Sequence, residues 1–185
     1  MANALAVLDI IKNALPVGIK FTQWIYNNIE KLYKEKKEAQ KSKEELLYAI
    51  YNELRKNLAF TGSRKPGSLN TFAPNSPEVK TAASKLKITF LTKIHKIAAP
   101  FGKSNKLPSM FNEIFNDIDK AIRLTNDFRG ITKMTDTELA TRQKPNMDLK
   151  LKNIAKSYLA VYSKLFKTEK DNNTKKQTIK KFTQK

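Results

Sequence analysis

The chain has 185 residues, of which 36 are Lys or Arg and 17 are Asp or Glu, so its formal net charge at pH 7 is +19. It contains no cysteine and one histidine, His95, which excludes disulfides and thiol chemistry and leaves little material for a metal site. Hydrophobic residues make up 40% of the chain and its mean hydropathy is −0.55, which argues against both a membrane-spanning and a fully disordered protein.

Apolar residues recur at helical spacing from the start of the chain, which predicts an all-α fold. Residues 2–15 are predicted to form a short amphipathic helix. Residues 18–59 carry two apolar runs that stay in phase, so we expect one long, straight or gently kinked second helix. A helical hairpin is the alternative, because Ser42 and Glu45 have the spacing of a capping box that would start a new helix.

The middle of the chain is predicted as a loop followed by two helices. Residues 61–76 are rich in Gly, Ser, Pro and Asn, which indicates a loop. The sequence Ser76–Pro77–Glu78 is typical of a helix start, and the apolar spacing after it predicts one continuous helix over residues 77–98. A further helix is expected from about Pro108 to Phe128.

Toward the C-terminus, residues 131–146 are expected to be an irregular connection with one short turn, since Thr135 and Glu138 have capping-box spacing. The last clear helix is predicted over about residues 147–168. The sequence thus predicts a bundle of about five helices over residues 1–169, followed by a lysine-rich tail over residues 170–185.

The positive charge is concentrated in two segments. Residues 61–100 contain 7 basic residues and 1 acidic residue, and residues 131–185 contain 14 and 5, so together they hold +15 of the +19. Of the 36 basic residues, 31 are lysine. Because lysine is a hydrated point charge, this composition favours contact with phosphates or lipid headgroups over the reading of bases. A solvated face that only keeps the protein soluble is the alternative.

We therefore expect a non-enzymatic structural or assembly protein that binds a polyanion, above all nucleic acid phosphates without sequence specificity. Such a protein fits a larger particle, such as a virion or a ribonucleoprotein, with other protein subunits as partners, and a location inside the cell or within a virus particle. No cofactor and no small-molecule substrate is expected. The expected contact residues are Arg64, Lys65, Lys85, Lys93, Lys96, Lys103, Lys106, Lys175, Lys176, Lys180, Lys181 and Lys185.

A peripheral membrane-associated helical bundle is the alternative function. The first helix is more apolar than the rest of the chain, and the Trp24 that follows suits a membrane interface. Neither a secretory signal nor a bilayer span is expected, because charged residues interrupt this helix and it is too short to span. The residues facing anionic lipid would be Leu5, Leu8, Ile11, Leu15 and Trp24.

No motif indicates a catalytic site. Two glycines in the loop have the spacing of a phosphate-binding loop, but the Lys-Ser or Lys-Thr that must follow is missing. His95 is predicted to lie at the edge of an apolar helix face as an ordinary flanking histidine. Glu113 and Asp117 are one helical turn apart and are expected to be a surface pair balanced by Lys120.

Overall fold

The computed structural model describes residues 10, 12–32, 43–65 and 67–167. In these residues it contains seven α-helices, one 3₁₀ turn and no strand, so the predicted all-α class is confirmed and the expected number of about five helices is too low. The elements are α2 (Pro16–Leu32), α3 (Lys43–Gly62), α4 (Pro77–Lys85), α5 (Thr89–Lys103), the 3₁₀ turn η1 (Ser109–Phe111), α6 (Asn112–Ile131), α7 (Asp136–Ala140) and α8 (Met147–Leu165).

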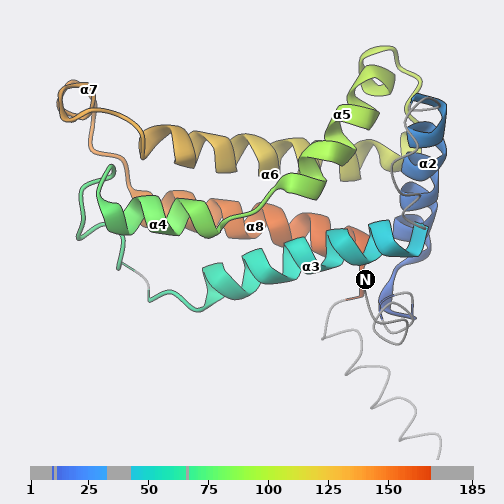
Figure 1. The fold of residues 1–185 in the computed structure, drawn as a ribbon, viewed down its shortest axis with the longest axis horizontal. Coiled ribbons are helices and arrows are strands. Elements are labelled where there is room, and N and C mark those ends of the chain that lie inside the picture. Colours follow the sequence, from blue (N-terminus) through green and yellow to red (C-terminus); the bar gives the residue numbers. More distant parts are fainter. Residues whose placement is uncertain (1–9, 11, 33–42, 66, 168–185) are drawn as a thin grey trace, which may run out of the picture.

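Helix α8 lies at the centre of the packing and contacts α6, α3 and α2. Figure 1 shows α6 and α8 side by side along the length of the molecule, with α2 standing across one end. Helices α4 and α5 follow one another along the molecule and both pack against α6, while α5 also contacts α3 and α2. The lysines that α4 and α5 carry are exposed: Lys80, Lys85, Lys93, Lys96 and Lys103.

The core is formed by apolar residues that recur every three or four positions on each helix. Within it, the hydroxyl groups of Tyr158 on α8 and Thr125 on α6 form a buried hydrogen bond, with their oxygens 2.7 Å apart. Burial raises the pKa of Tyr158 to about 12. The tyrosine is therefore kept neutral where α6 and α8 pack together.

The expected long second helix is wrong. Helices α2 and α3 pack against each other and run in clearly different directions, which two ends of one straight helix cannot do. Both have an apolar face to bury, and Phe21 and Ile25 of α2 share one core with Ile50 and Leu54 of α3. The connection, residues 33–42, lies outside the described residues, as does Ser42 of the predicted capping box.

The single helix predicted over residues 77–98 is also wrong, because the chain breaks between α4 and α5 at residues 86–88, called here the α4–α5 junction. Leu86 has extended backbone angles, with φ −73° and ψ 119°. The apolar positions of the predicted helix nevertheless remain buried on both sides of the break, as Val79 and Ile94 show. The apolar spacing therefore predicted the buried positions correctly, although the helix is not continuous.

Side chains from other helices hold the junction. Asn57 of α3 accepts a hydrogen bond from the Lys87 N–H at 2.9 Å and donates one to the Lys87 carbonyl. The buried carboxylate of Glu53, one turn earlier on α3, accepts bonds from the N–H groups of Phe90 and Leu91, each at 2.9 Å. These N–H groups belong to the first turn of α5, where helical partners are missing and a negative charge is favourable.

The junction is also held from α6. Arg129 donates a hydrogen bond to the carbonyl of Leu86, just beyond the end of α4. Helix ends leave carbonyl groups without helical partners, and a cation there is favourable. The broken backbone thus gains partners from α3 and α6 in place of its own helical bonds.

The two ends of the described chain are tied together. Ala14 and Phe166 form an antiparallel bridge. On either side of it the Leu15 N–H donates to the Leu165 carbonyl at 2.9 Å, and the Lys167 N–H donates to the carbonyl of Asn13 at 2.8 Å. The helix predicted over residues 2–15 cannot be judged as a whole, since residues 1–9 and 11 lie outside the described residues.

Gly18 allows the start of α2 to approach the end of α8. A Cβ atom added at Gly18 would lie 2.5 Å from the carbonyl oxygen of Leu165 and 2.9 Å from its Cα. Both neighbours are backbone atoms, so they cannot move aside as a flexible side chain could. A residue with a side chain at this position would push the two helices apart.

The predicted local signals agree with the structure. The Ser76 side chain caps α4, and Pro77 is its first residue. Thr135 and Glu138 form a complete capping box that starts α7, and the hydrogen bond from the Thr135 N–H lowers the pKa of the Glu138 carboxyl. Helix α8 begins at Met147 as expected. The predicted tail over residues 170–185 lies outside the described residues.

Candidate functional site

One side of α3 leads from the junction to a group of cations. Glu53, Asn57, Phe60 and Arg64 follow each other at intervals of four, three and four residues, which places them on the same side of the helix and of the turn after it. The first two hold residues 87–91, as described above. Phe60 and Arg64 therefore continue along the same edge toward the end of α4.

Two of the predicted cations meet at the ring of Phe60. The guanidinium carbon of Arg64 lies 5.4 Å from the ring centroid, and the Lys85 Nζ lies 5.7 Å from it. After the junction, the Lys93 Nζ lies 5.6 Å from the centroid of Phe90. Cations at such distances are attracted by the negative face of an aromatic ring. We call Phe60, Arg64, Lys85, Phe90 and Lys93 the junction surface.

Among the described residues, the cations of this region have no acidic partners. Within the part of the chain that the structure describes, the predicted contact residues between positions 64 and 106 form no ion pair with Asp or Glu. These residues are Arg64, Lys65, Lys85, Lys93, Lys96, Lys103 and Lys106. All six lysines are exposed and Arg64 is half-buried. Their charge is therefore available to an external anion.

Acidic groups of α6 instead neutralise lysines of α8. Lys150 lies 2.8 Å from a carboxylate oxygen of Asp127. Lys164 lies 2.7 Å from Asp117 and 3.1 Å from Glu113, and its hydrogen bond to Asp117 is the main cause of a raised pKa of its amine. The expected balance of Glu113 and Asp117 by Lys120 is thus replaced by Lys164, which the packing of α6 on α8 brings close.

The structure does not gather every predicted residue at the junction surface. Lys65, Lys96, Lys103 and Lys106 form no cation–ring contact among the described residues. The five predicted tail lysines lie outside the described residues: Lys175, Lys176, Lys180, Lys181 and Lys185.

Sequence reasoning missed Phe60 and Phe90 as neighbours of the cations, and it missed Glu53 and Asn57 as the residues that hold the junction. One signal was present. Glu53 and Asn57 are polar residues one turn apart beside the apolar face of α3, which is where a buried polar contact would be expected.

The residues of the membrane alternative are only partly described. Leu5, Leu8 and Ile11 lie outside the described residues. The Trp24 ring packs against Phe101 and Phe111, with ring centroids 5.1 Å and 5.8 Å apart, so Trp24 contributes to the packing of α2 on α5 and η1. None of the described helices is long and apolar enough to cross a membrane.

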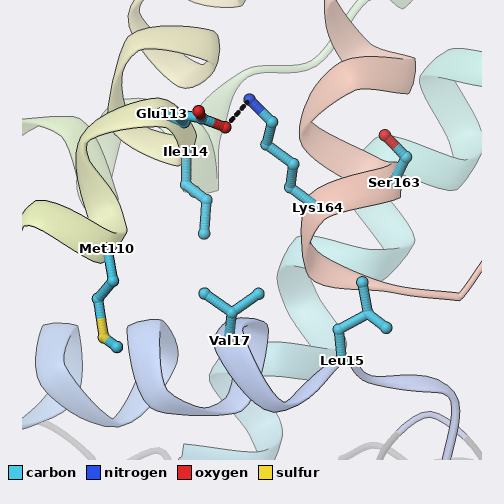
Figure 2. Close-up of a pocket in the computed structure, with 7 residues that line it drawn as sticks. All are labelled: Leu15, Val17, Met110, Glu113, Ile114, Ser163 and Lys164. Carbon is cyan, nitrogen blue, oxygen red and sulfur yellow. Dashed lines mark ion pairs between the residues drawn. The ribbon is translucent and has the colours of Figure 1, made fainter.

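Leu15, the remaining residue of that alternative, is half-buried and lines an open pocket of about 300 Å³. Figure 2 shows Leu15 and Val17 opposite Ile114 and Met110, with the ion pair between Glu113 and Lys164 at one side. Ser163 also lines the pocket. The one cation of the pocket is already neutralised by carboxylates, so this site offers no free charge to a polyanion.

His95 has a structural role between α5 and α6. Its Nε2 lies 2.9 Å from an Asp119 carboxylate oxygen, and its ring stacks on Phe115 at a centroid distance of 5.1 Å and an interplanar angle of 8°. No group of three or more His, Asp or Glu residues that could hold a metal ion occurs in the described residues.

Comparisons of the chain with protein-family models, with curated proteins and with solved structures found no match.

Proposed function

We propose that this chain is a non-enzymatic structural or assembly protein that binds nucleic acid through its phosphates, without reading the base sequence. Its place would be in a larger particle, such as a virion or a ribonucleoprotein, beside other protein subunits. The observation that carries this proposal is the group of cations between Arg64 and Lys106 that have no acidic partners among the described residues.

The fold leaves some cations without a carboxylate beside them and pairs others. A lysine beside a carboxylate, such as Lys150 or Lys164, has its charge offset within the protein. A lysine without such a partner gains more from a phosphate, because binding releases the counterions condensed on the nucleic acid. The net charge of +19 adds self-repulsion that a polyanion would relieve.

The absence of sequence reading follows from the residue types. Bidentate contact with guanine is made mainly by arginine, and Arg64 is the one arginine in the group. Lysines contact phosphate oxygens in any sequence. We therefore expect similar affinity for strands of different sequence but equal length.

The test is the salt dependence of binding to labelled oligonucleotides. A triple variant with R64Q, K85Q and K93Q should bind more weakly and lower the slope of log affinity against log salt by roughly 2–3, since each phosphate contact contributes about 0.7–0.9. The matched control neutralises three exposed lysines of α6 and α8, with K120Q, K152Q and K156Q, and so removes the same charge elsewhere.

The two triple variants separate a specific surface from bulk charge. A much smaller effect of the control supports the proposed surface. Equal effects would show that only the net charge matters, and the assignment of the surface would be wrong. If the unaltered chain binds neither DNA nor RNA at low salt, the proposed function is wrong.

A further inference from the structure

The junction surface carries two aromatic rings among its cations. Phe60 and Phe90 are half-buried and pack against the core. Each ring has a cation within 6 Å of its centroid, and Phe60 has two. A surface that contacts only phosphates needs no aromatic rings. Rings that lie beside cations suit a ligand with flat apolar faces as well as negative charge.

The contacts at the junction hold the backbone of Phe90 against α3, the helix that carries Phe60. The Glu53 carboxylate binds the backbone N–H of Phe90, and the Asn57 amide binds the backbone of Lys87. Glu53 and Phe60 are seven residues apart on α3, which is about 10 Å along the axis at about 1.5 Å per residue. Phe60 and the backbone of Phe90 therefore lie at different points along one edge of α3.

Single-stranded nucleic acid has the required chemistry. In a duplex the base faces are covered by their neighbours, and the surface presents phosphates and base edges. A single strand presents phosphates and base faces together, and proteins bind it with cationic grooves that contain aromatic rings. The Arg64 guanidinium lies over the Phe60 ring, 5.4 Å from its centroid, and guanidinium planes also stack on bases.

We infer that the nucleic acid bound at the junction surface is single-stranded and that a base stacks at Phe60. The inference rests on the proposed function, because it names the class of nucleic acid for that same surface. Phe60 would supply the contact that distinguishes a strand with bases from a bare chain of phosphates.

The test compares probes of equal charge with and without bases. Labelled oligo-thymidine and an abasic strand of the same length, roughly 15 nucleotides to match a single binding site, are titrated with the full chain and followed by fluorescence anisotropy. Phe60→Leu removes the ring but keeps an apolar side chain, and Phe60→Tyr keeps the ring. The control is Phe101→Leu, which removes a half-buried ring that packs on Trp24 of α2.

Phe60→Leu should weaken binding of oligo-thymidine roughly 5- to 150-fold, the range expected for loss of one stacked base. Its affinity for the abasic strand should stay unchanged. Phe60→Tyr should retain most of the affinity for oligo-thymidine, and Phe101→Leu should bind both probes like the unaltered chain. Circular dichroism of each variant checks that the helices are intact.

Two other outcomes have distinct meanings. If Phe60→Leu changes the affinity for both probes equally, or for neither, while R64Q and K85Q still weaken both, the stacking inference is overturned and the proposed function remains. If the unaltered chain binds no probe at low salt, the proposed function fails and the inference fails with it.

Discussion

Replacing Asn57 by alanine tests whether the α4–α5 junction is held from α3. Asn57 is fully buried, and its side-chain amide makes two hydrogen bonds with the backbone of Lys87. Alanine would remove both bonds and leave an N–H and a carbonyl group at the break without these partners. Lys87 lies between α4 and α5, outside both helices.

The expected cost follows from opposing contributions. The loss of two hydrogen bonds in a partly buried place costs about 2–3 kcal/mol. Alanine is also the better helix former in α3, which returns roughly 0.6 kcal/mol. The free energy of unfolding should therefore fall by about 1.5–2.5 kcal/mol, and the melting temperature by roughly 3–10 °C for a chain of this length.

The assay is urea unfolding followed by circular dichroism, with stability taken from the midpoint at constant slope. The control is Asn153→Ala, at an exposed position within α8. It gains the same helix propensity without losing these bonds, so it should be slightly more stable than the unaltered chain. Asn57→Asp keeps the acceptor for the Lys87 N–H but places a carboxylate against the Lys87 carbonyl, and should destabilise at least as much as alanine.

If the free energies of unfolding of Asn57→Ala and Asn153→Ala agree within about 0.5 kcal/mol, the two Asn57 hydrogen bonds do not hold the junction. The break would then have to be favoured by residues 86–88 themselves or by the contacts of α6. A loss confined to Asn57→Ala and Asn57→Asp supports the role of α3.

Two further predictions concern other parts of the bundle. Gly18→Ala should lower the free energy of unfolding by roughly 1–3 kcal/mol, because the added Cβ would lie 2.5 Å from the carbonyl oxygen of Leu165. The control Gly130→Ala, where no atom lies within 4 Å of the added Cβ, should raise the free energy of unfolding slightly. Equal melting temperatures for the two variants would contradict the close packing at Gly18. The Tyr158 pKa of about 12 lies above the ordinary value of 10, so the unfolded chain loses this proton first and stability should fall by roughly 2–3 kcal/mol as the pH rises from about 10 to 12. Urea unfolding across that range should show a shallower decline for Tyr158→Phe, and equal declines would show that Tyr158 is not responsible.

The features that sequence predicted correctly are set by neighbouring residues. Ser76 caps α4 and Thr135 with Glu138 caps α7, and each contact joins residues three positions apart. Helix α8 starts where an asparagine, Asn146, stands before a run of helical apolar spacing. Such signals do not depend on the rest of the fold, so reading the sequence locally is enough to find them.

The junction could not be predicted in this way. No glycine or proline occurs between Glu78 and Ala99, and the apolar spacing continues unchanged through the break. The groups that hold it, on Glu53, Asn57 and Arg129, come from residues 30 to 43 positions away. Only the packing of α3 and α6 brings them to the broken backbone.

The same limit applies to the candidate site. The sequence alone indicated Lys85, Lys93 and Lys96 as contact residues, and all three are exposed. It could not show that Arg64 and Lys85 meet at Phe60, because that contact depends on where α4 ends and on how it lies beside α3. The exposure of a lysine follows from its place on its own helix. The meeting of Arg64 and Lys85 at one ring depends on the tertiary structure.

The bridge between Ala14 and Phe166 has a mechanical consequence. Because the two segments are antiparallel, the chain leaves the bridge at Asn13 and at Lys167 on the same side, where a hydrogen bond joins the two residues. Pulling Asn13 and Lys167 apart would break the bonds of this bridge one after another, beginning with that bond. Tension applied at these two residues would therefore open the bridge before it reached the packing of α2 on α8.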